Sequence, residues 1–394
     1  MQFRFFAHSW LSDWNHGNAH FLRGLVAALM RRGHQVRAYE EIPQPAGGWS
    51  LAHLLTETRG PAAIAQMRAA FAQLDLRFYG SACGSLHPVL AAACVRCVQS
   101  WEDELRDADW VIAHEWNPPE LFHWLLEQRQ KYGFRLLLHD THHRALTEPG
   151  IVERLPVSHF DGVLAFGRSL AQMYQRAGAK RCFVLHEAAD AKNFHPRTVT
   201  PMWDLIWIGN WGDDERTSEI DEYLFRPAQR LRLRALVFGV RYPPDAIARL
   251  RNSGIEFGGY LPNLSAPEAY ASAKVALHIP RGPYARELPG IPTIRVFEAL
   301  ACGSALVCAP WTDSESLFDP GNDFATVPTG EAMCAALVQL LSQEEQRRQR
   351  GAHGAAAIAA RHTCTHRAQQ LEAICQQITA RHAPASTSPS SVPV

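Results

Sequence analysis

The stretch Pro289-Gly-Ile-Pro-Thr-Ile-Arg-Val-Phe-Glu-Ala-Leu-Ala-Cys-Gly-Ser-Ala-Leu-Val307 reads as a loop, a helix and a strand in immediate succession. Its first residues exclude a helix upstream, whereas Pro292 suits a first helical turn, where its missing N–H costs nothing. Apolar residues then recur at helical spacing until Gly303 ends the helix before the apolar strand that begins at Ala305. This order of elements predicts an α/β domain with a parallel sheet.

The start of this helix is also the first candidate ligand site. A helix that opens from a Gly/Pro loop presents unpaired N–H groups and the positive end of its dipole, which suits a phosphate. Arg295 and Glu298 lie three residues apart, so the guanidinium could meet phosphate oxygens while the carboxylate accepts hydroxyl protons from a sugar. The same pair also fits an ordinary surface ion pair on a helix, and periodicity alone does not separate these interpretations.

Short apolar strands and amphipathic helices alternate along nearly the whole chain, which predicts two doubly wound, Rossmann-like domains. A polar, proline-punctuated connector at 186–203 separates the two series. Ligands of such folds bind beyond the carboxyl ends of the strands, so we expect the site in a cleft between the domains. The predicted units are a first domain (1–190) with a helical, strand-free insertion (41–107), a second domain (200–362), a helix (363–382) and a disordered tail (383–394).

Composition excludes several classes of protein. Lysines plus arginines (39) equal aspartates plus glutamates (39), so no overall field attracts nucleic acid or an anionic membrane. No stretch approaches the roughly 18 apolar residues of a spanning helix, and the N-terminal residues lack the apolar core of a signal peptide. Nine scattered cysteines fit a reducing compartment better than a disulfide framework. We expect a cytoplasmic protein without a transmembrane segment, and peripheral attachment at the inner membrane face stays open.

Polar residues follow the predicted strands of the first domain. After the first strand, Gly17 would let the backbone approach a ligand closely, and Asn18 and His20 could bond to hydroxyls. The alternative is a long turn with Asn18 as a helix cap. After the strand at 109–113, Glu115 could bind sugar hydroxyls, or it could be the N-terminal carboxylate of a helix.

A histidine cluster, His139-Asp-Thr-His-His143, ends the strand at 134–138. Ligands at successive loop positions rarely converge on one ion, so we expect no metal site here. We predict instead that His142, held by Asp140, acts as a hydrogen-bonding or general-base group in the cleft, because imidazole titrates near neutrality.

Glycine, arginine or aromatic residues follow four strands of the second half. Each turn on its own also fits a plain loop, but together they outline a nucleotide pocket. In that pocket Tyr260 or Leu261 would contact the base and Arg281 a phosphate. The predicted pocket residues at these strand ends are Gly209, Asn210, Arg241, Tyr260, Leu261 and Arg281.

Three stretches resemble the GT-B glycosyltransferases of the group-1 superfamily and, within it, the CgeB-like branch. They are Gly17-Asn-Ala-His-Phe-Leu-Arg-Gly24, the connector Glu187-Ala-Ala-Asp190 with Phe194-His-Pro196, and above all Arg295-Val-Phe-Glu-Ala-Leu-Ala-Cys-Gly303. The resemblance covers roughly residues 1–380 and implies two domains facing a cleft, with the last helix crossing back to the first domain. It implies transfer of a sugar from a nucleoside diphosphate donor on the second domain to an acceptor on the first. The acceptor could be a glycan, a lipid, a protein or a small molecule, and the resemblance implies no metal and no cofactor.

The resemblance also assigns roles to residues. Glu298 matches the glutamate that binds the donor ribose, and the amides that follow Gly290 would hold the diphosphate. Related retaining enzymes carry a second glutamate eight positions earlier, where this chain has Gly290, so Glu287 is a displaced candidate for the catalytic carboxylate. The donor-binding residues implied in this segment are Gly290, Thr293, Ile294, Arg295 and Glu298.

Two other functions stay open at this point. A nucleotide-sugar epimerase could use the same two-domain plan, with internal acid and base groups in place of an acceptor. A sugar- or nucleotide-binding protein without catalytic activity is the other alternative, and the glycine at position 290 is the best argument for it.

Overall fold

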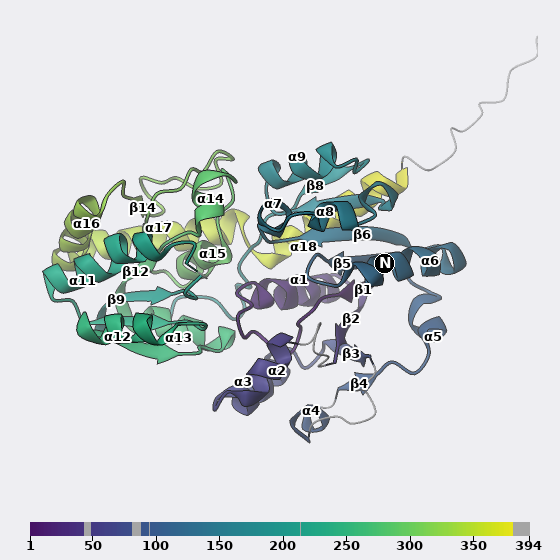
Figure 1. Cartoon of the computed structure of the whole chain (residues 1–394), viewed down its shortest axis with the longest axis horizontal. Helices are drawn as coiled ribbons and strands as arrows, with labels where there is room; N and C mark the ends of the chain where they lie inside the picture. Colours follow the sequence, from purple (N-terminus) through teal and green to yellow (C-terminus); the bar gives the residue numbers. More distant parts are fainter. Residues whose placement is uncertain (43–48, 81–87, 94, 213, 381–394) are drawn as a thin grey trace, which may run out of the picture.

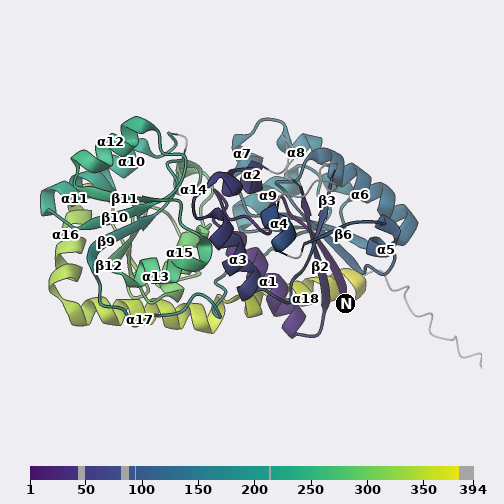
Figure 2. The ribbon, with the colours of Figure 1, turned by 90° about the horizontal axis from the view of Figure 1, so that it is seen from below.

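The structure is a computed structural model of the 394-residue chain, and it describes residues 1–42, 49–80, 88–93, 95–212 and 214–380. The tail predicted over 383–394 lies outside the described residues. Two α/β units lie side by side, and long C-terminal helices run along both of them (Figures 1 and 2). No helix in the described part of the chain is long and apolar enough to cross a membrane.

A sheet of eight parallel strands, counted over the described residues, forms the centre of the first unit. In spatial order the strands are β4 (Arg96–Cys97), β3 (Asp75–Tyr79), β2 (Gln35–Glu41), β1 (Gln2–Phe6), β5 (Trp110–His114), β6 (Arg135–Asp140), β7 (Gly162–Ala165) and β8 (Cys182–Val184). The helices are α1 (Ala19–Arg31), α2 (Trp49–Thr56), α3 (Gly60–Ala70), α4 (Pro88–Ala92), α5 (Trp101–Leu105), α6 (Pro119–Tyr132), α7 (Arg144–Thr147), α8 (Ile151–Arg154), η2 (Val157–His159) and α9 (Arg168–Arg176).

The second unit has a six-stranded parallel sheet within the described residues. In spatial order its strands are β11 (Ile255–Gly259), β10 (Ala235–Phe238), β9 (Trp203–Ile208), β12 (Ala273–His278), β13 (Ala305–Cys308) and β14 (Ala325–Thr326). The helices are α10 (Thr217–Ile220), η3 (Asp221–Phe225), α11 (Arg226–Leu231), α12 (Pro244–Asn252), η4 (Asn263–Ser265), α13 (Ala266–Ala271), α14 (Gly282–Arg286), α15 (Ile294–Ala301), α16 (Gly330–Ser342) and α17 (Glu344–Arg361).

Both sheets are buried on their two faces. On β1, Phe3 and Phe5 join the core that contains α1, whereas Phe6 joins the core of the opposite face. On β9, Ile206 and Trp207 divide between two cores in the same way. Successive side chains of a strand point to opposite faces, so a sheet covered by helices on both sides needs strands that are apolar throughout. The predicted architecture of two doubly wound parallel sheets is confirmed.

The last helix, α18 (Cys364–Ala380), returns to the first unit and packs on α1. The two segments that cross between the units are hydrogen-bonded: the amide of Ala189 donates to the carbonyl of His362 at 3.0 Å, and the amide of Cys364 to the carbonyl of Ala189 at 2.9 Å. Farther along α18, Glu372 accepts from Arg32 at 2.6 Å. These contacts fix α18 to the first unit, as predicted.

One expectation was wrong. The insertion at 41–107 was predicted to contain no strand, but β3 and β4 extend the sheet there beyond β2. Leu76 and Phe78 are buried between outward-facing neighbours in β3, which is the alternation of a strand with one face on the core. The alanine-rich helices on either side hide this short pattern in the sequence.

In each sheet the strand order reverses beside the first strand of the unit. Strand β1 lies between β2 and β5, and β9 lies between β10 and β12. The connections that leave on either side of such a point separate, and they open a crevice at the carboxyl ends of the strands. The two crevices belong to the facing sides of the units, so the fold itself predicts where a ligand lies.

Candidate functional site

An open cavity of about 310 Å³ lies between the two units, at the carboxyl ends of β1, β5, β6, β9, β10 and β12. Ten of the residues predicted from the sequence line it. They are Gly17, Asn18, His142, Gly209, Asn210, Arg241, Arg281, Thr293, Ile294 and Arg295. The strand ends that converge here are those beside both reversals of strand order, which explains why these residues lie together.

The helix α15 begins at the wall of the cavity. The hydroxyl of Thr293, at the N-cap, pairs with Nε2 of His278 at 2.9 Å and does not cap the helix. Gly17 of the first unit lies against this turn: a Cβ atom there would be 3.3 Å from Cγ2 of Ile294 and 3.4 Å from Nη2 of Arg295. The first turn of α15 therefore brings amide groups and a positive dipole end to the cavity, as an anion site requires.

Arginines surround this helix start. Arg216 is buried, and it donates from Nη1 to the carbonyl of Ile279 at 2.7 Å and from Nη2 to the carbonyl of Asn210. Burial and the neighbouring Arg281 lower the pKa of Arg216 to about 9, so it stays charged at neutral pH. Its Nε atom is buried without a hydrogen-bond partner. Arg281 contacts Glu215 at 3.4 Å, and Arg295 completes the group.

The sequence analysis did not select Arg216, although it ends the glycine-bearing turn that follows β9. The signal in the sequence that could have identified Arg216 was its position beyond the end of a predicted strand. Nothing in the sequence alone shows that this strand lies at the centre of the sheet, where the cavity forms.

Glu298 lies behind Arg295. Its carboxylate is 0% exposed, pairs with Arg295 and lies 3.0 Å from Nδ1 of His20, whose ring stacks on Phe194 at 4.2 Å. Burial raises the pKa of Glu298, but Arg295 and His20 outweigh it, so the pKa lies below its ordinary value. The predicted direct contacts of Glu298 and His20 with a ligand are not supported, because both side chains are turned into the core and hold Arg295 in place.

Glu187, in the connector, is the buried carboxylate of the cavity wall. It is 3% exposed. Burial and the nearby Glu298 raise the pKa of Glu187 well above its usual range. Hydrogen bonds from Asn18 and from the amide of Ile294 lower this pKa, but by less. In the sequence analysis this glutamate appeared only as part of a family-like connector, without a role. The structure places it directly beside the start of α15.

His142 lines the cavity, but Asp140 does not hold its ring. The carboxylate of Asp140 accepts from the backbone amide of His142 at 2.8 Å and from the hydroxyl of Tyr174 at 2.6 Å. Burial raises the pKa of Asp140 to about 6. Burial, His143 and Arg281 lower the pKa of His142 well below its ordinary value, so the imidazole is neutral. Asp140 thus fixes the loop backbone and leaves the ring free to meet a ligand.

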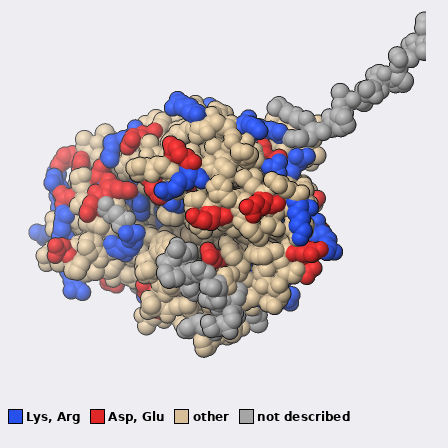
Figure 3. Space-filling model, turned by 45° about the vertical axis from the view of Figure 1, so that its right-hand side comes forward, with Lys and Arg blue, Asp and Glu red and all other residues tan. Residues whose placement is uncertain are grey.

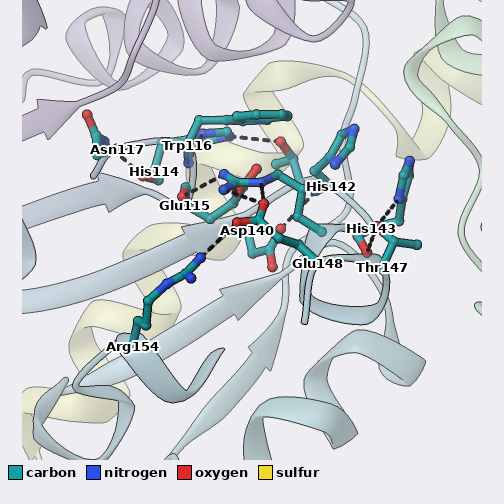
Figure 4. A network of polar contacts seen from close by, with 12 residues as sticks. His114, Glu115, Trp116, Asn117, Asp140, His142, His143, Thr147, Glu148 and Arg154 are labelled. Atoms are coloured by element: carbon teal, nitrogen blue, oxygen red, sulfur yellow. Dashed lines mark hydrogen bonds and ion pairs between the residues drawn. The ribbon is translucent and has the colours of Figure 1, made fainter. Parts of the chain in front are cut away.

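A polar network supports the wall next to His142 (Figure 4). Glu115 is buried and pairs with Arg144 at 3.0 Å, and Arg144 also bonds to Glu148 at 2.8 Å. The guanidinium of Arg144 lies 4.2 Å from the ring centre of Trp116. Glu115 was predicted to bind sugar hydroxyls, but its carboxylate supports Arg144, and it is Trp116 that lines the cavity.

Two residues predicted to contact the base lie elsewhere. The hydroxyl of Tyr260 donates to Asp13, and its carbonyl accepts from Arg59 at 3.3 Å. Leu261 is partly buried against the hydrophobic core. Both follow β11, which is the edge strand of its sheet, so its carboxyl end lies away from the point where the strand order reverses.

Gly290 and Glu287 are also displaced from the cavity. Gly290 has φ +85°, its amide donates to the carbonyl of Thr312 at 2.7 Å, and a Cβ atom would lie 2.6 Å from Oγ of Ser314. This backbone conformation and the close packing explain why position 290 is a glycine. Glu287 is exposed at the end of α14, so the prediction of a catalytic role for it is not supported.

Several contacts join the units around the cavity. The Nδ2 atom of Asn210 donates to Oδ1 of Asn15 at 2.6 Å. Asp13 accepts from the amide of Asn263 at 2.9 Å, and Glu315 accepts from the amide of Arg168 at 2.6 Å. The described arrangement is therefore a closed one, in which the two walls of the cavity contact each other directly. On the face shown in Figure 3, charges of both signs are interspersed over both units.

Comparison with known proteins gives the fold a name. Residues 216–373 match a protein family described as glycosyl transferase-like. Sucrose-phosphate synthase from Thermosynechococcus elongatus is 14% identical, with 97% of this chain and 100% of that chain covered and a TM-score of 0.63. HepE from Anabaena, solved with UDP-glucose, is 12% identical, with 96% and 100% covered and a TM-score of 0.62.

The BGT protein of phage T4, solved with its UDP-glucose substrate, is 12% identical, with 96% of this chain and 99% of that chain covered and a TM-score of 0.52. A search of curated proteins gave no significant match. The similarities extend over the whole two-unit architecture and show that the chain has the GT-B fold of two facing Rossmann-like domains. They confirm the fold predicted from the sequence.

Proposed function

We propose that this protein is a glycosyltransferase that moves a sugar from a nucleoside diphosphate sugar to a hydroxyl group of an acceptor. One observation carries the proposal: in a GT-B fold, the N-terminus of α15 and four arginines converge on one interdomain cavity. A pyrophosphate needs this combination of oriented amides and fixed positive charge. HepE and the T4 protein were both solved with UDP-glucose, which supports a nucleotide-sugar ligand for this fold.

In this proposal the arginines act on the leaving group. Negative charge accumulates on the pyrophosphate as the bond between the sugar and the phosphate breaks. Arg216, Arg281 and Arg295 are held in place before the reaction, so they stabilise this charge without having to reorganise. We propose that these guanidinium groups and the dipole of α15 together neutralise the leaving group, so that transfer needs no metal ion.

The proton of the attacking hydroxyl also needs an acceptor. Glu187 and His142 are titratable groups on the first-domain side, and both line the cavity. Burial and Glu298 raise the pKa of Glu187, which strengthens its carboxylate as a base, whereas burial lowers the pKa of His142, which weakens its imidazole as a base. We therefore assign proton transfer to Glu187 and a hydrogen bond with the acceptor or the sugar to His142.

A thermal-shift panel with UDP, GDP, dTDP and ADP tests donor binding first. The expected result is a higher melting temperature with one of the four, since a ligand that binds only the folded state stabilises it. The protein is then incubated with the matching nucleotide sugar and no acceptor. Slow release of the nucleotide supports a transferase, and a new epimer of the sugar supports the epimerase. A blank panel with no turnover supports a protein without catalytic activity and contradicts the proposal.

A further inference from the structure

The two walls of the cavity differ in charge. Among the described residues, every arginine that lines it belongs to the second domain, and no lysine or arginine of the first domain lines it. The wall of the first domain carries histidine, tryptophan, phenylalanine, asparagine and threonine side chains and the carboxyl group of Glu187 instead. A phosphorylated or carboxylated acceptor would find no cation on this wall and would compete with the donor for the arginines opposite.

Besides His143, whose Nε2 atom also lacks a hydrogen-bond partner, three histidines of this wall have ring nitrogen atoms without a partner among the described residues. These are Nδ1 of His8, both ring nitrogens of His16 and Nδ1 of His142. The rings of His8 and His16 are 4.2 Å apart, and each residue is only 5% exposed. Leaving a buried polar atom without a partner costs free energy, so the wall is arranged to receive polar groups from a ligand.

All three imidazoles are uncharged. Burial lowers the pKa of His8 to about 3, with Arg144 as a smaller cause, and it lowers the pKa of His16 and His142 well below the ordinary value. A neutral imidazole has one N–H donor and one acceptor nitrogen. A hydroxyl group also donates one hydrogen bond and accepts others, so it matches this wall better than an anion does.

Trp116 places a flat apolar surface between these histidines. Its ring is 5.6 Å from His8 and 5.0 Å from His142, and Figure 4 shows Trp116 beside His142 above the polar network. Arg144, held by Glu115, supports the indole through a cation–π contact at 4.2 Å. An indole anchored in this way offers an apolar face to the C–H groups of a sugar ring, whose hydroxyls can reach the imidazoles.

We propose that His8, His16, Trp116 and His142 form an acceptor subsite for a neutral carbohydrate. The assignment rests on the proposed glycosyltransferase function, because an acceptor requires a donor on the opposite wall. A lipid chain needs a continuous apolar surface, whereas on this wall polar groups are interspersed with the aromatic rings of Trp49, Trp116 and Phe166. An acidic acceptor needs a cation, which the first-domain wall does not offer.

Saturation-transfer NMR on the full protein tests the subsite without requiring turnover. The protein is saturated with whichever of the four nucleoside diphosphates raises its melting temperature, and then given methyl glycosides of neutral hexoses, glucuronic acid, glucose 6-phosphate or dispersed short-chain phosphatidylglycerol. A neutral glycoside should bind. Trp116→Ala and His16→Leu should weaken its binding by about tenfold, while His16→Asn keeps a hydrogen-bonding group and should lose less. His123→Leu, at an exposed position of α6, is the matched control.

The outcomes separate the two proposals. An unchanged nucleotide-induced shift in melting temperature shows that each variant is folded and keeps its donor site. Binding of only the acidic sugars or the lipid overturns the carbohydrate assignment, and so does equal binding of the neutral glycoside by wild type and Trp116→Ala. If no nucleotide binds in the first step, the glycosyltransferase proposal fails before the acceptor is tested.

Discussion

Replacing Arg216 with methionine removes the buried guanidinium that we propose binds the pyrophosphate. Its Nε atom has no hydrogen-bond partner among the described residues, and Arg216 lines the same cavity as the start of α15. A hydrogen bond to a charged group contributes about 1.5–3 kcal/mol. The dissociation constant of the nucleoside diphosphate should therefore rise by roughly 10- to 100-fold. Arg216→Lys keeps the charge but cannot reproduce the planar fork, so it should recover only part of the affinity.

The same substitution also affects stability, and the two effects can be measured separately. The carbonyls of Ile279 and Asn210 lose their donors, which should lower the free energy of unfolding by about 1–3 kcal/mol for each buried acceptor. Isothermal titration at a temperature well below the melting point measures binding to the folded variant, and urea unfolding measures stability. Arg251→Met, at an exposed position of α12, is the control. A folded Arg216→Met variant with wild-type affinity would refute the role of Arg216 in the anion site.

Three further predictions concern glutamates. Glu187→Gln should leave nucleotide affinity within a fewfold of wild type but lower kcat by about 10²- to 10⁴-fold, as steady-state kinetics would show, and an unchanged kcat excludes proton transfer by Glu187. Burial raises the pKa of Glu40 to about 7. Its contribution to stability is therefore full below its ordinary pKa of 4.5 and declines by about 3 kcal/mol as pH rises to 7. Urea unfolding of Glu40→Gln should lack this decline, because a carboxamide does not ionise, and its oxygen can still accept from two loop amides. The same slope in both proteins would contradict this explanation. Glu298→Ala should lose about 3–5 kcal/mol of stability because Arg295 and His20 lose their partner, and denaturant midpoints equal to wild type would remove Glu298 from that role.

The sequence predicted the strand ends well because alternation and glycine-bearing turns are local patterns. Gly17, His142, Arg281 and Arg295 were chosen as polar or glycine residues beside strand or helix ends, and all four line the cavity. What the sequence does not contain is the order of strands in the sheet. Tyr260 follows a strand as convincingly as Arg281 does, but its strand lies at the edge of the sheet.

The spacing of residues along the sequence also could not show how deeply each side chain is buried. The i, i+3 spacing correctly placed Arg295 and Glu298 together, but only packing against His20 shows that the carboxylate is buried beneath the guanidinium. Glu187 was missed for the related reason that the connector carries no periodic pattern. Glu187 lies in the cavity because the connector passes between the two sheets. This path brings residues that are distant in the sequence close together.

A crystal structure of the protein with the nucleoside diphosphate selected by the thermal-shift panel would show whether the interdomain cavity binds a pyrophosphate. We expect the pyrophosphate at the first turn of α15, with oxygen atoms within hydrogen-bond distance of its amides and of Arg216 and Arg281. The nucleotide should extend along the second-domain wall and leave Trp116 and His142 open to an acceptor. A pyrophosphate bound outside this cavity, or one in contact with neither α15 nor these arginines, would contradict this expectation.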